Sequence, residues 1–398
     1  MRSQPLEGRR IWFVGIGGAG LSGYALLASA WGAEVAGWDR FETPYLQYVR
    51  RAGIPVSVAP EPLRTPEGWE TVVSTAFADR VQGRGRAEFL AELVSLERAI
   101  VVTGTHGKTT TAAMIAYCLD RAGGDPSFLI GGEIPQLGGN ARAGTGWLVV
   151  EGDESDRTVA ELRPEIAVVT NVELDHHATF ASRAELESLL ECWLAQVPQV
   201  VRGSELEPVG FELAFPGEHN RRNAACALAA LELAGLAPHE SASLLAEFRG
   251  AGRRFEARGE ARGVTVYDDY AHHPAEVAAV IAAARERSAG RVLGVFQPHL
   301  YSRTRHLWLE FARALAALDV ACVTEIYPAR EQPIAGVSGK LIVDAFALVR
   351  PGMPVGWTPA LPDASRFIAR RARRGDLVLT MGAGDVESVA PLLLRALG

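Results

Sequence analysis

The 398-residue sequence predicts an α/β protein built from open, mostly parallel sheets. Short β-branched runs alternate with helical segments along much of the chain. Two glycine-rich loops each follow such a run and open a helix, and polar or glycine residues directly follow several other strands. Ligands of open α/β sheets bind beyond the carboxyl ends of the strands, so the same pattern indicates where the functional residues lie.

The composition is that of a globular chain whose length suggests two or three domains. The net charge of −7 arises from well-mixed acids and bases, which argues against a nucleic-acid-binding protein. Four widely spaced cysteines without a C-x-x-C pair indicate reduced thiols and a cytoplasmic protein. No signal region and no run of about 18 apolar residues is present, so we expect no membrane span. A monomer and a homodimer both remain open.

The first glycine loop, GIGGAG at Gly15–Gly20, follows a strand that begins at Ile11 and opens a helix over Leu21–Ala30. Its glycines fit the pattern G-x-G-x-x-G at Gly15, Gly17 and Gly20. A second strand ends near Asp39, about where a dinucleotide-binding fold places the acid that binds the ribose. The loop predicts binding of a diphosphate group, and both NAD and a nucleotide-sugar carry one.

The second glycine loop, GTHGKTT at Gly104–Thr110, lies between a β-branched run over Ala99–Thr103 and a helix that continues to Gly123. The standard phosphate loop, G-x-x-x-x-G-K-[ST], would need a glycine where Val102 stands. The flanking strand and helix nevertheless favour a phosphate loop over an accidental turn. We expect an ATP-like ligand, with Lys108 at the outer phosphates and the Thr109 hydroxyl on a magnesium ion.

Two further strands end in groups that bind metals. The strand before Glu151 is followed by four acids over Glu151–Asp156, and Glu151 emerges first, which makes it the best magnesium candidate. The strand that begins at Ile166 leads to His176, a candidate second ligand. A solvated acidic loop and a structural histidine are the alternatives.

Asn220 and Asn223 lie three residues apart at the start of a predicted helix that runs to Gly235, and they share one helix face. Their amides are able to read the edge of a base. The sequence alone favours Asn220 as a helix N-cap.

The last third of the chain carries a cluster of acids and histidines. Asp268, Asp269, His272 and His273 fall within six residues, between a strand and a helix that begins at Pro274, and exceed any structural need. Three later strands also end in polar or glycine-rich runs, so we expect one crevice to collect them. These runs are Gln297–Thr304, Glu325–Arg330 and Gly382–Asp385.

Taken together, the motifs resemble the Mur ligases, in order and over nearly the whole chain. The motifs are Gly15–Gly23, Gly104–Thr111, Glu151–Asp156, Thr170–His176, Pro216–Asn220, Asp268–Pro274, Phe296–Thr304 and Tyr327–Glu331. The resemblance implies a Rossmann-like UDP-sugar domain over 1–95, a shortened P-loop ATPase-like domain over 96–254, and a Rossmann-like ligase domain over 255–398.

The resemblance also implies a reaction and its partners, and is strongest to the branch of the family that joins L-alanine to UDP-N-acetylmuramate. The lactyl carboxylate is activated by ATP as an acyl phosphate, which the amine then attacks. ATP and Mg²⁺ are the implied cofactors, and cytoplasmic peptidoglycan precursor synthesis is the implied process.

Residue roles carried over from the family follow the matching motifs. The UDP-sugar would lie on Gly15, Gly17, Gly18, Ala19, Gly20 and Asp39. ATP would contact Gly104, Thr105, His106, Gly107, Lys108, Thr109, Thr110, His219, Asn220 and Asn223. The metal ligands would be Thr109, Glu151 and His176. The reacting groups would lie near Lys108, Asp269 and His273.

Two departures from the family pattern stand out. Trp38 replaces a small polar residue before Asp39, which affects the expected uridine contacts. The span from Asp175 to Pro216 is shorter than is usual in the family. We predict that the missing segment is peripheral, because the remainder still predicts a helix over Ala184–Gln196 and a strand at Val200, and that the central sheet stays continuous.

Three alternatives remain open. The murein-peptide branch of the family adds a recycled tripeptide to the same nucleotide-sugar, but it typically carries tyrosine at the position of Ser155. An inactive, shortened homologue would only bind nucleotide-sugar, and the intact Lys108, Glu151 and His176 speak against it. An NAD-dependent dehydrogenase would leave the Lys108 loop unexplained.

Overall fold

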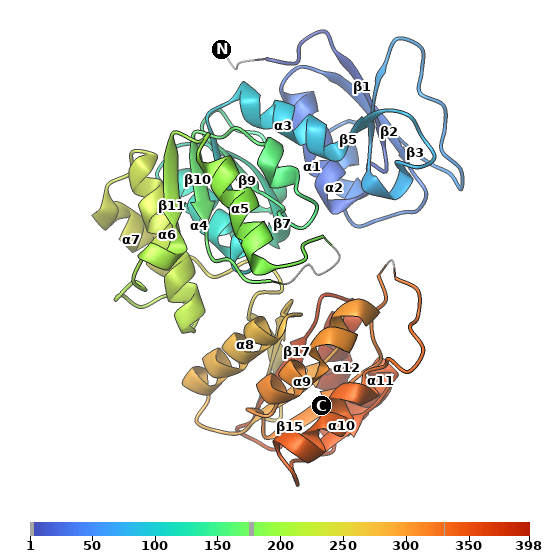
Figure 1. Ribbon diagram of the computed structural model, residues 1–398, viewed down its shortest axis with the longest axis vertical. Helices are drawn as coiled ribbons and strands as arrows, with labels where there is room; N and C mark the ends of the chain where they lie inside the picture. Colours follow the sequence, from blue (N-terminus) through green and yellow to red (C-terminus); the bar gives the residue numbers. More distant parts are fainter. Residues whose placement is uncertain (1–3, 175–178, 330) are drawn as a thin grey trace. The chain divides into compact units, whose positions relative to one another are not determined.

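The computed structural model describes residues 4–174, 179–329 and 331–398, and the chain divides into two compact units. The first unit comprises Met1–Glu212 and Arg222–Phe248, and the second comprises Leu213–Arg221 and Arg249–Gly398. Two sheets belong to the first unit and one sheet to the second (Figure 1). The three sheets fall within the three predicted domain ranges, but the compact units join the first two sheets, so the boundary near residue 95 stays a prediction.

The first sheet has five parallel strands in the order β3-β2-β1-β4-β5. The chain runs outward from β1 in one direction and then returns to continue beyond β1 in the other, which is the Rossmann-like arrangement that the sequence predicts. The loop after β1 therefore lies at the point where the strand order reverses. The elements are β1 (Arg10–Val14), α1 (Ala19–Ala30), β2 (Glu34–Asp39), α2 (Leu46–Arg51), β3 (Val56–Val58), β4 (Glu70–Val73), β5 (Arg84–Gly85) and α3 (Arg86–Leu96).

The second sheet has six strands in the order β11-β10-β6-β9-β7-β8, and only β8 is antiparallel to its neighbour. It is continuous, as predicted, and the predicted helix and strand after residue 183 are confirmed as α5 and β11. The elements are β6 (Ala99–Thr103), α4 (Lys108–Arg121), β7 (Ser127–Ile134), β8 (Gly139–Arg142), β9 (Leu148–Glu151), β10 (Ile166–Val169), α5 (Arg183–Leu194), β11 (Gln199–Arg202), α6 (Glu218–Leu233) and α7 (Pro238–Glu247).

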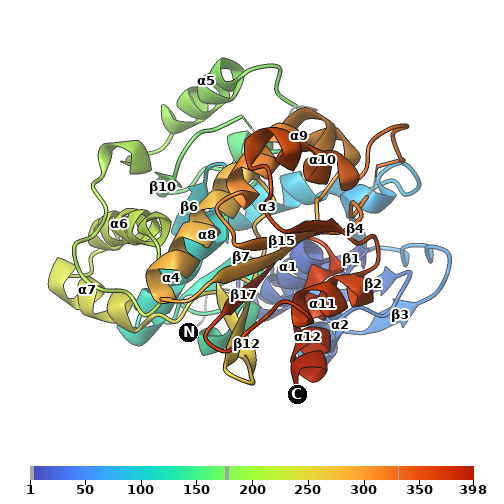
Figure 2. The same ribbon diagram turned by 90° about the horizontal axis from the view of Figure 1, so that it is seen from below.

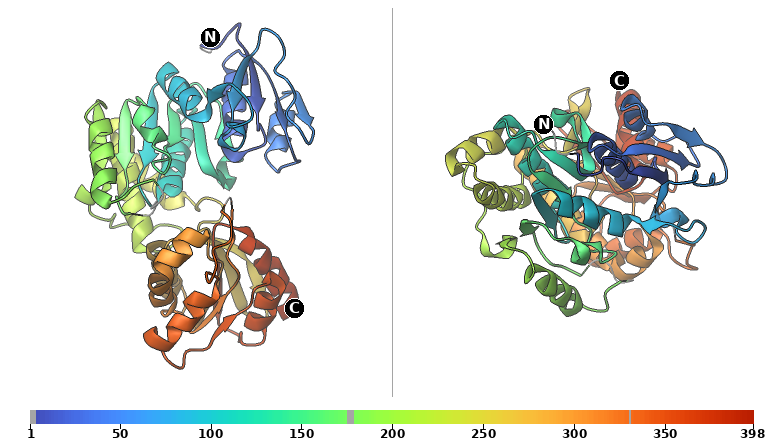
Figure 3. Two further views of the ribbon diagram at one scale, coloured as in Figure 1. Left: turned by 45° about the vertical axis from the view of Figure 1, so that its right-hand side comes forward. Right: turned by 90° about the horizontal axis from the view of Figure 1, so that it is seen from above.

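Within the first unit, α1 of the first sheet packs on the β7–β8 hairpin of the second (Figure 3). Gly23 permits this close approach, because a Cβ there would lie 2.8 Å from Leu129 Cδ2 and 3.0 Å from Ala141 Cβ. The Asn140 side chain donates a hydrogen bond to the Ala19 carbonyl at 3.3 Å. Helix α4 lies on β6, β9 and β7 of the second sheet and also packs on α7 (Figure 2).

The third sheet has the order β12-β13-β17-β14-β15-β16, with only β12 antiparallel. One apolar cluster joins α8, α9 and α10 to the sheet, and a second cluster joins α11 and α12 to it, so helices cover both faces (Figure 1). The elements are β12 (Glu256–Ala261), β13 (Val264–Asp269), α8 (Pro274–Arg287), β14 (Val292–Phe296), α9 (Tyr301–Leu315), β15 (Val320–Val323), α10 (Lys340–Val349), β16 (Val355–Trp357), α11 (Leu361–Ala369), β17 (Leu377–Met381) and α12 (Val389–Leu397).

Within residues 4–174, 179–329 and 331–398 there are also five short 3-10 helices. They are η1 (Thr75–Phe77), η2 (Pro135–Leu137), η3 (Thr158–Glu161), η4 (Gly203–Glu205) and η5 (Asp385–Ser388). Across the described ranges, every helix is too short or too polar to cross a membrane.

Candidate active site

The loop between β6 and α4 is a tight turn that depends on two glycines. Gly104 has φ +123° and Gly107 has φ +80°, both in the region that favours glycine. Neither position has room for a side chain, because a Cβ at Gly104 would overlap the Thr170 hydroxyl and a Cβ at Gly107 would overlap the Asn223 amide. The loop without the usual first glycine is therefore an ordered, closely packed turn.

Asn171, just beyond β10, holds this loop in place. Its backbone carbonyl accepts a hydrogen bond from the Thr105 amide at 3.1 Å, and its side chain bonds both to the His106 amide and to the His106 carbonyl at 2.9 Å. The Thr170 hydroxyl also donates to the His106 carbonyl, at 2.6 Å. The sequence placed Asn171 in a motif but gave no sign of this role, which arises because β10 is the neighbour of β6.

Helix α4 begins at Lys108, so that Lys108 and Thr109 occupy its first turn. The Thr109 hydroxyl lies 3.0 and 3.1 Å from the two carboxylate oxygens of Glu151, which ends the neighbouring strand β9. The Gly131 amide donates to the same carboxylate at 2.7 Å. A hydroxyl and a carboxylate side by side at a helix start are oxygen donors suited to Mg²⁺. The predicted third ligand, His176, lies outside the described residues.

The Lys108 ammonium faces back over its own loop. It donates to the carbonyl oxygens of Gly104 and Thr105 at 2.6 and 3.3 Å, and to Glu154 Oε1 at 3.0 Å. Burial alone would lower the pKa of Lys108, but the charges of Glu154 and Glu151 outweigh it, and the pKa is raised. Lys108 is therefore a cation at the place where the outer phosphates of a nucleotide are expected.

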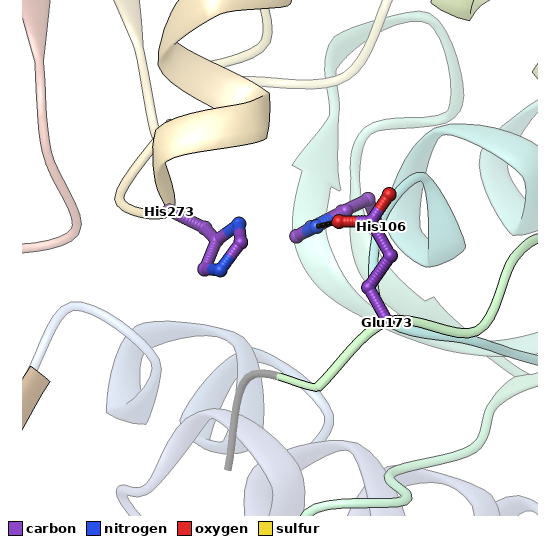
Figure 4. Close-up of side chains that lie close together, drawn as sticks. All are labelled: His106, Glu173 and His273. Carbon is purple, nitrogen blue, oxygen red and sulfur yellow. Dashed lines mark hydrogen bonds and ion pairs between the residues drawn. The ribbon is translucent and has the colours of Figure 1, made fainter. Parts of the chain in front are cut away.

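Two of the predicted histidines are shown in Figure 4. The imidazole of His106 faces the Glu173 carboxylate, with Nε2 and Oε2 3.3 Å apart, and both residues belong to the first unit. His273 belongs to the second unit and is the N-cap of α8, where its Nδ1 accepts from the Ala275 amide at 3.4 Å. Glu276 accepts from the His273 amide at 3.2 Å, which completes a capping box.

The loop after β1 has a different construction. Gly15 turns the chain with φ +84°. The Gly17 amide donates to Asp39 Oδ2 at 2.7 Å, and the Arg40 amide donates to Asp39 Oδ1 at 2.7 Å. Asp39 thus braces the loop, and its contact with the nucleotide-sugar stays a prediction. Gly18 is the N-cap of α1, with Ala19 and Gly20 in the first turn, and no side chain caps this helix end.

Trp38, the departure noted before Asp39, is a core residue. Its side chain is fully buried in a cluster with Trp12 and Val73, and its ring meets Phe77 edge-on with centroids 5.0 Å apart. The indole therefore stabilises the sheet face that it packs on.

In the second unit, the two aspartates at the end of β13 are both buried and hydrogen-bonded. Asp269 accepts from the Phe255 and Ala271 amides at 2.7 Å each. Burial raises the pKa of Asp269 to about 6, and the charge of Arg254 opposes that shift. Asp268 accepts from the Thr380 hydroxyl at 2.5 Å. Both acids thus have structural partners, and a role for the cluster beyond structure stays a prediction.

The other strand ends of this sheet meet as predicted. Gln297, after β14, donates to Asp385, after β17, at 2.7 Å. His299 forms a parallel bridge with Tyr327, and their rings stack with centroids 5.8 Å apart. The crevice residues of one sheet edge are therefore brought together within this unit.

The expectation that Asn220 caps α6 was wrong. Helix α6 begins at Glu218, and Asn220 lies two residues inside it, where its side chain donates to the Pro216 carbonyl at 2.6 Å. Burial lowers the pKa of the adjacent His219 to about 4, helped by the charge of Arg254. His219 and Asn220 belong to the second unit, whereas Asn223 belongs to the first and packs against Gly107.

Comparison with known proteins places these features in one family. Residues 10–98 match the description "Mur ligase family, catalytic domain", residues 102–189 match "Mur ligase middle domain", and residues 253–384 match "Mur ligase, glutamate ligase domain". The three matches fall on the three sheets in order.

Curated relatives are similar over their full length. A UDP-N-acetylmuramate–L-alanine ligase from Kineococcus radiotolerans is 40% identical, with 98% of this chain and 96% of the relative covered. One from Renibacterium salmoninarum is 38% identical, with the same coverage. The latter alignment spans 453 positions against 398 residues here, so the relative has residues that this chain lacks; their place in the central domain stays a prediction.

Solved structures agree with the sequence comparison. A UDP-N-acetylmuramate–alanine ligase from Thermotoga maritima is 27% identical with a TM-score of 0.80, and 97% of this chain and 98% of that chain are covered. A murein peptide ligase from Psychrobacter arcticus is 25% identical with a TM-score of 0.65, with 98% and 99% covered. From its three domain matches and its full-length relatives, the chain belongs to the Mur ligase family.

Proposed function

We propose that the protein is an ATP-dependent ligase that joins L-alanine to UDP-N-acetylmuramate through an acyl phosphate. One observation carries the proposal: the start of α4 presents the Lys108 ammonium and the Thr109–Glu151 pair on one phosphate loop. The names of the curated relatives supply the substrates. The dehydrogenase alternative offers no use for this loop.

The chemistry explains why such a loop is needed. A carboxylate is a poor electrophile, so a lactyl oxygen first attacks the γ-phosphorus of ATP, and ADP leaves. The amine of L-alanine then attacks the acyl carbon, and phosphate departs with that oxygen while the nitrogen loses a proton. Phosphoryl transfer of this kind depends mainly on positioning and on neutralising charge.

The proposal gives each residue of the loop a task. The loop residues Gly104, Thr105, His106, Gly107 and Thr110 would surround the phosphates at the positive end of α4, with Asn171 holding the Thr105 and His106 amides in place. Lys108 would neutralise charge at the γ-phosphate during transfer. Thr109 and Glu151 would hold Mg²⁺, which supplies further charge neutralisation when bound. Asn223 would contact the adenine side, since it packs against Gly107.

The remaining assignments rest on the family. His219 and Asn220 are proposed to contact adenine, and Asp269 and His273 are proposed to lie near the reacting groups. The loop over Gly15–Gly20 is proposed to hold the UDP part of the substrate, with Gly17, Gly18 and Ala19 at the diphosphate. His176 is proposed as a third metal ligand.

A substrate panel tests the proposal. Phosphate release would be measured with ATP, Mg²⁺ and UDP-N-acetylmuramate, with L-alanine, glycine, L-serine or the tripeptide L-alanyl-γ-D-glutamyl-meso-diaminopimelate as the amine, and the product would be weighed by mass spectrometry. We expect the highest kcat/KM and a UDP-N-acetylmuramoyl-L-alanine product with L-alanine. Preference for the tripeptide would assign the chain to the murein-peptide branch, and no release with any amine would leave an inactive homologue.

A further inference from the structure

Glu154 is a second carboxylate at the phosphate loop, three residues after Glu151, and it is fully buried. Its Oε1 accepts from Lys108 Nζ at 3.0 Å, and its Oε2 accepts from the Thr103 hydroxyl at 3.3 Å. Thr103 is the last residue of β6 and is itself fully buried. A buried carboxylate is costly unless a cation and hydrogen-bond donors satisfy it, so this contact orders Lys108 as well as Glu154.

The partners of Lys108 divide into two kinds. The carbonyl oxygens of Gly104 and Thr105 belong to the loop itself and carry no net charge. Glu154 is the ion-pair partner on a rigid support, because it is also hydrogen-bonded to the end of β6. A lysine side chain has four flexible bonds, and a fixed counter-charge selects one of its many conformations.

Glu151 and Glu154 therefore serve different neighbours. Glu151 contacts the Thr109 hydroxyl and the Gly131 amide, which is the side proposed to hold Mg²⁺. Glu154 contacts Lys108 and Thr103. Glu151 and Glu154 belong to one acid-rich run of the sequence. The turn after β9 separates them in the structure, so that the two carboxylates contact different neighbours.

We propose that Glu154 is a positioning residue that fixes the Lys108 ammonium on the loop before nucleotide binds. The proposal rests on the proposed function in one respect, namely that Lys108 acts on the nucleotide phosphates. Glu154 acts through Lys108 and needs no contact of its own with substrate.

The chain offers an internal reference for a direct test, because it contains only two lysines, Lys108 and Lys340. Lys340 lies half-exposed at the start of α10 and pairs with Asp344. The acetylation rates of both amines by acetic anhydride would be measured by mass spectrometry at pH 8.5, on the full chain without nucleotide. An amine that buried contacts hold in place reacts slowly, so the ratio of the two rates reports how firmly the Lys108 side chain is held.

Glu154→Gln keeps the shape of the side chain and removes its charge. We expect the Lys108-to-Lys340 rate ratio at pH 8.5 to rise at least tenfold, because the amine would lose the buried carboxylate that holds it on the loop. Glu161→Gln is the matched control, because it removes an exposed carboxylate from the neighbouring η3, and it should leave the ratio unchanged. An unchanged ratio in folded Glu154→Gln would overturn the proposal.

Nucleotide binding supplies a second readout. Calorimetry with ADP and Mg²⁺ should show at least tenfold weaker binding to Glu154→Gln, partial recovery in Glu154→Asp, and no further loss when Glu154→Gln is added to Lys108→Met. This lack of additivity would mean that Glu154 acts through Lys108. Tighter binding in Glu154→Gln would contradict the proposal, because it would make Glu154 a competitor of the phosphates.

The variants also separate this proposal from the proposed function. If Lys108→Met binds ADP like the unchanged protein, the role of Lys108 itself is wrong. If Lys108→Met binds weakly while folded Glu154→Gln binds normally, only the role of Glu154 is wrong. Circular dichroism would establish whether each variant folds. If Glu154→Gln does not fold, Glu154→Asp replaces it in both measurements. Its Lys108-to-Lys340 rate ratio and its affinity for ADP must then differ from those of Glu161→Gln.

Discussion

Lys108 is the one fully charged cation of the loop over Gly104–Thr110, and it lies in the first turn of α4. Its role follows from three contacts that hold the ammonium over the loop and from the positive end of the helix beneath it. These contacts are local to the loop and to Glu154 and lie outside the apolar core of the sheets, so a variant without the ammonium loses a buried ion pair but keeps its fold. Removing the ammonium should therefore change chemistry far more than folding.

Lys108→Ala should lower kcat/KM for ATP by at least about 100-fold, the loss typical when one charge-stabilising donor is removed from a transition state. Its circular dichroism spectrum should match that of the unchanged protein. Lys340→Ala, at the exposed start of α10, is the control and should retain activity. Normal turnover by folded Lys108→Ala would refute the assignment.

Position 107 requires glycine for two reasons, its left-handed backbone conformation and the close approach of the Asn223 side chain. Gly107→Ala should weaken ADP binding, because the new Cβ would overlap the Asn223 amide. Gly123→Ala is a matched control: Gly123 has the same φ of +80° but open space around it. Both variants should lose about 1 kcal/mol of stability from the left-handed conformation. Equal ADP affinity in the two variants would show that the contact with Asn223 is unimportant.

At the scale of the elements, the start of α6 and the end of β13 carry two groups of the second unit whose pKa values are shifted in opposite ways. The pKa of His219 falls from 6.5 to about 4, and that of Asp269 rises from 3.8 to about 6. The folded state therefore loses stability through His219 as the pH falls from about 6.5 to 4. Over nearly the same range it gains stability through Asp269, whose contribution is lost as the pH rises through 6.

The opposite pH dependences contributed by His219 and Asp269 should largely cancel in the unchanged protein. A variant that lacks His219 should reveal them separately. Between pH 7 and pH 4, the free energy of unfolding of His219→Gln should rise by about 3 kcal/mol relative to the unchanged protein, since each pKa unit corresponds to about 1.4 kcal/mol. Urea unfolding of the second unit at several pH values would measure this difference. A difference in the free energy of unfolding that does not vary with pH would mean that the pKa of His219 is not lowered in the folded chain.

Sequence patterns predicted those helices and strands that their own residue types are sufficient to specify. The β-branched run over Ala99–Thr103 became β6 with the predicted bounds, and Pro274 opened α8. The β7–β8 hairpin was not predicted, because Gly131 and Gly132 interrupt the pattern of β7. The polar strand β12 was not predicted either, since its place is fixed by pairing with β13.

The candidate site shows the same division. Loop residues such as Lys108 and Thr109 are identified by a local motif. Asn171 and Glu154 are identified only when β10 and the turn after β9 are placed beside β6, because their importance is a matter of contacts across the sheet. Asn220 was misread because the helix starts at Glu218, three residues earlier than an N-cap at Asn220 would place its start.

At the scale of the whole molecule, two glycine loops on two sheets predict two phosphate-bearing ligands for one reaction. Asp39, the acid that would select NAD, is already bonded to the Gly17 and Arg40 amides. UDP-N-acetylmuramate at 100 times its Kd should stabilise the protein by about 2.7 kcal/mol and raise Tm, and NAD should not. Calorimetric titration of both ligands would check this, and tight NAD binding without a response to the nucleotide-sugar would refute it.

The path of one oxygen atom reveals whether the lactyl carboxylate is activated as an acyl phosphate. UDP-N-acetylmuramate labelled with ¹⁸O in both lactyl carboxylate oxygens would be incubated with ATP, Mg²⁺ and L-alanine, and the released phosphate would be examined by mass spectrometry. An acyl phosphate requires that each phosphate carries one ¹⁸O and that the amide product keeps the other. Phosphate without label, formed while ATP is consumed, would mean that water attacks the nucleotide and that the lactyl carboxylate is never activated.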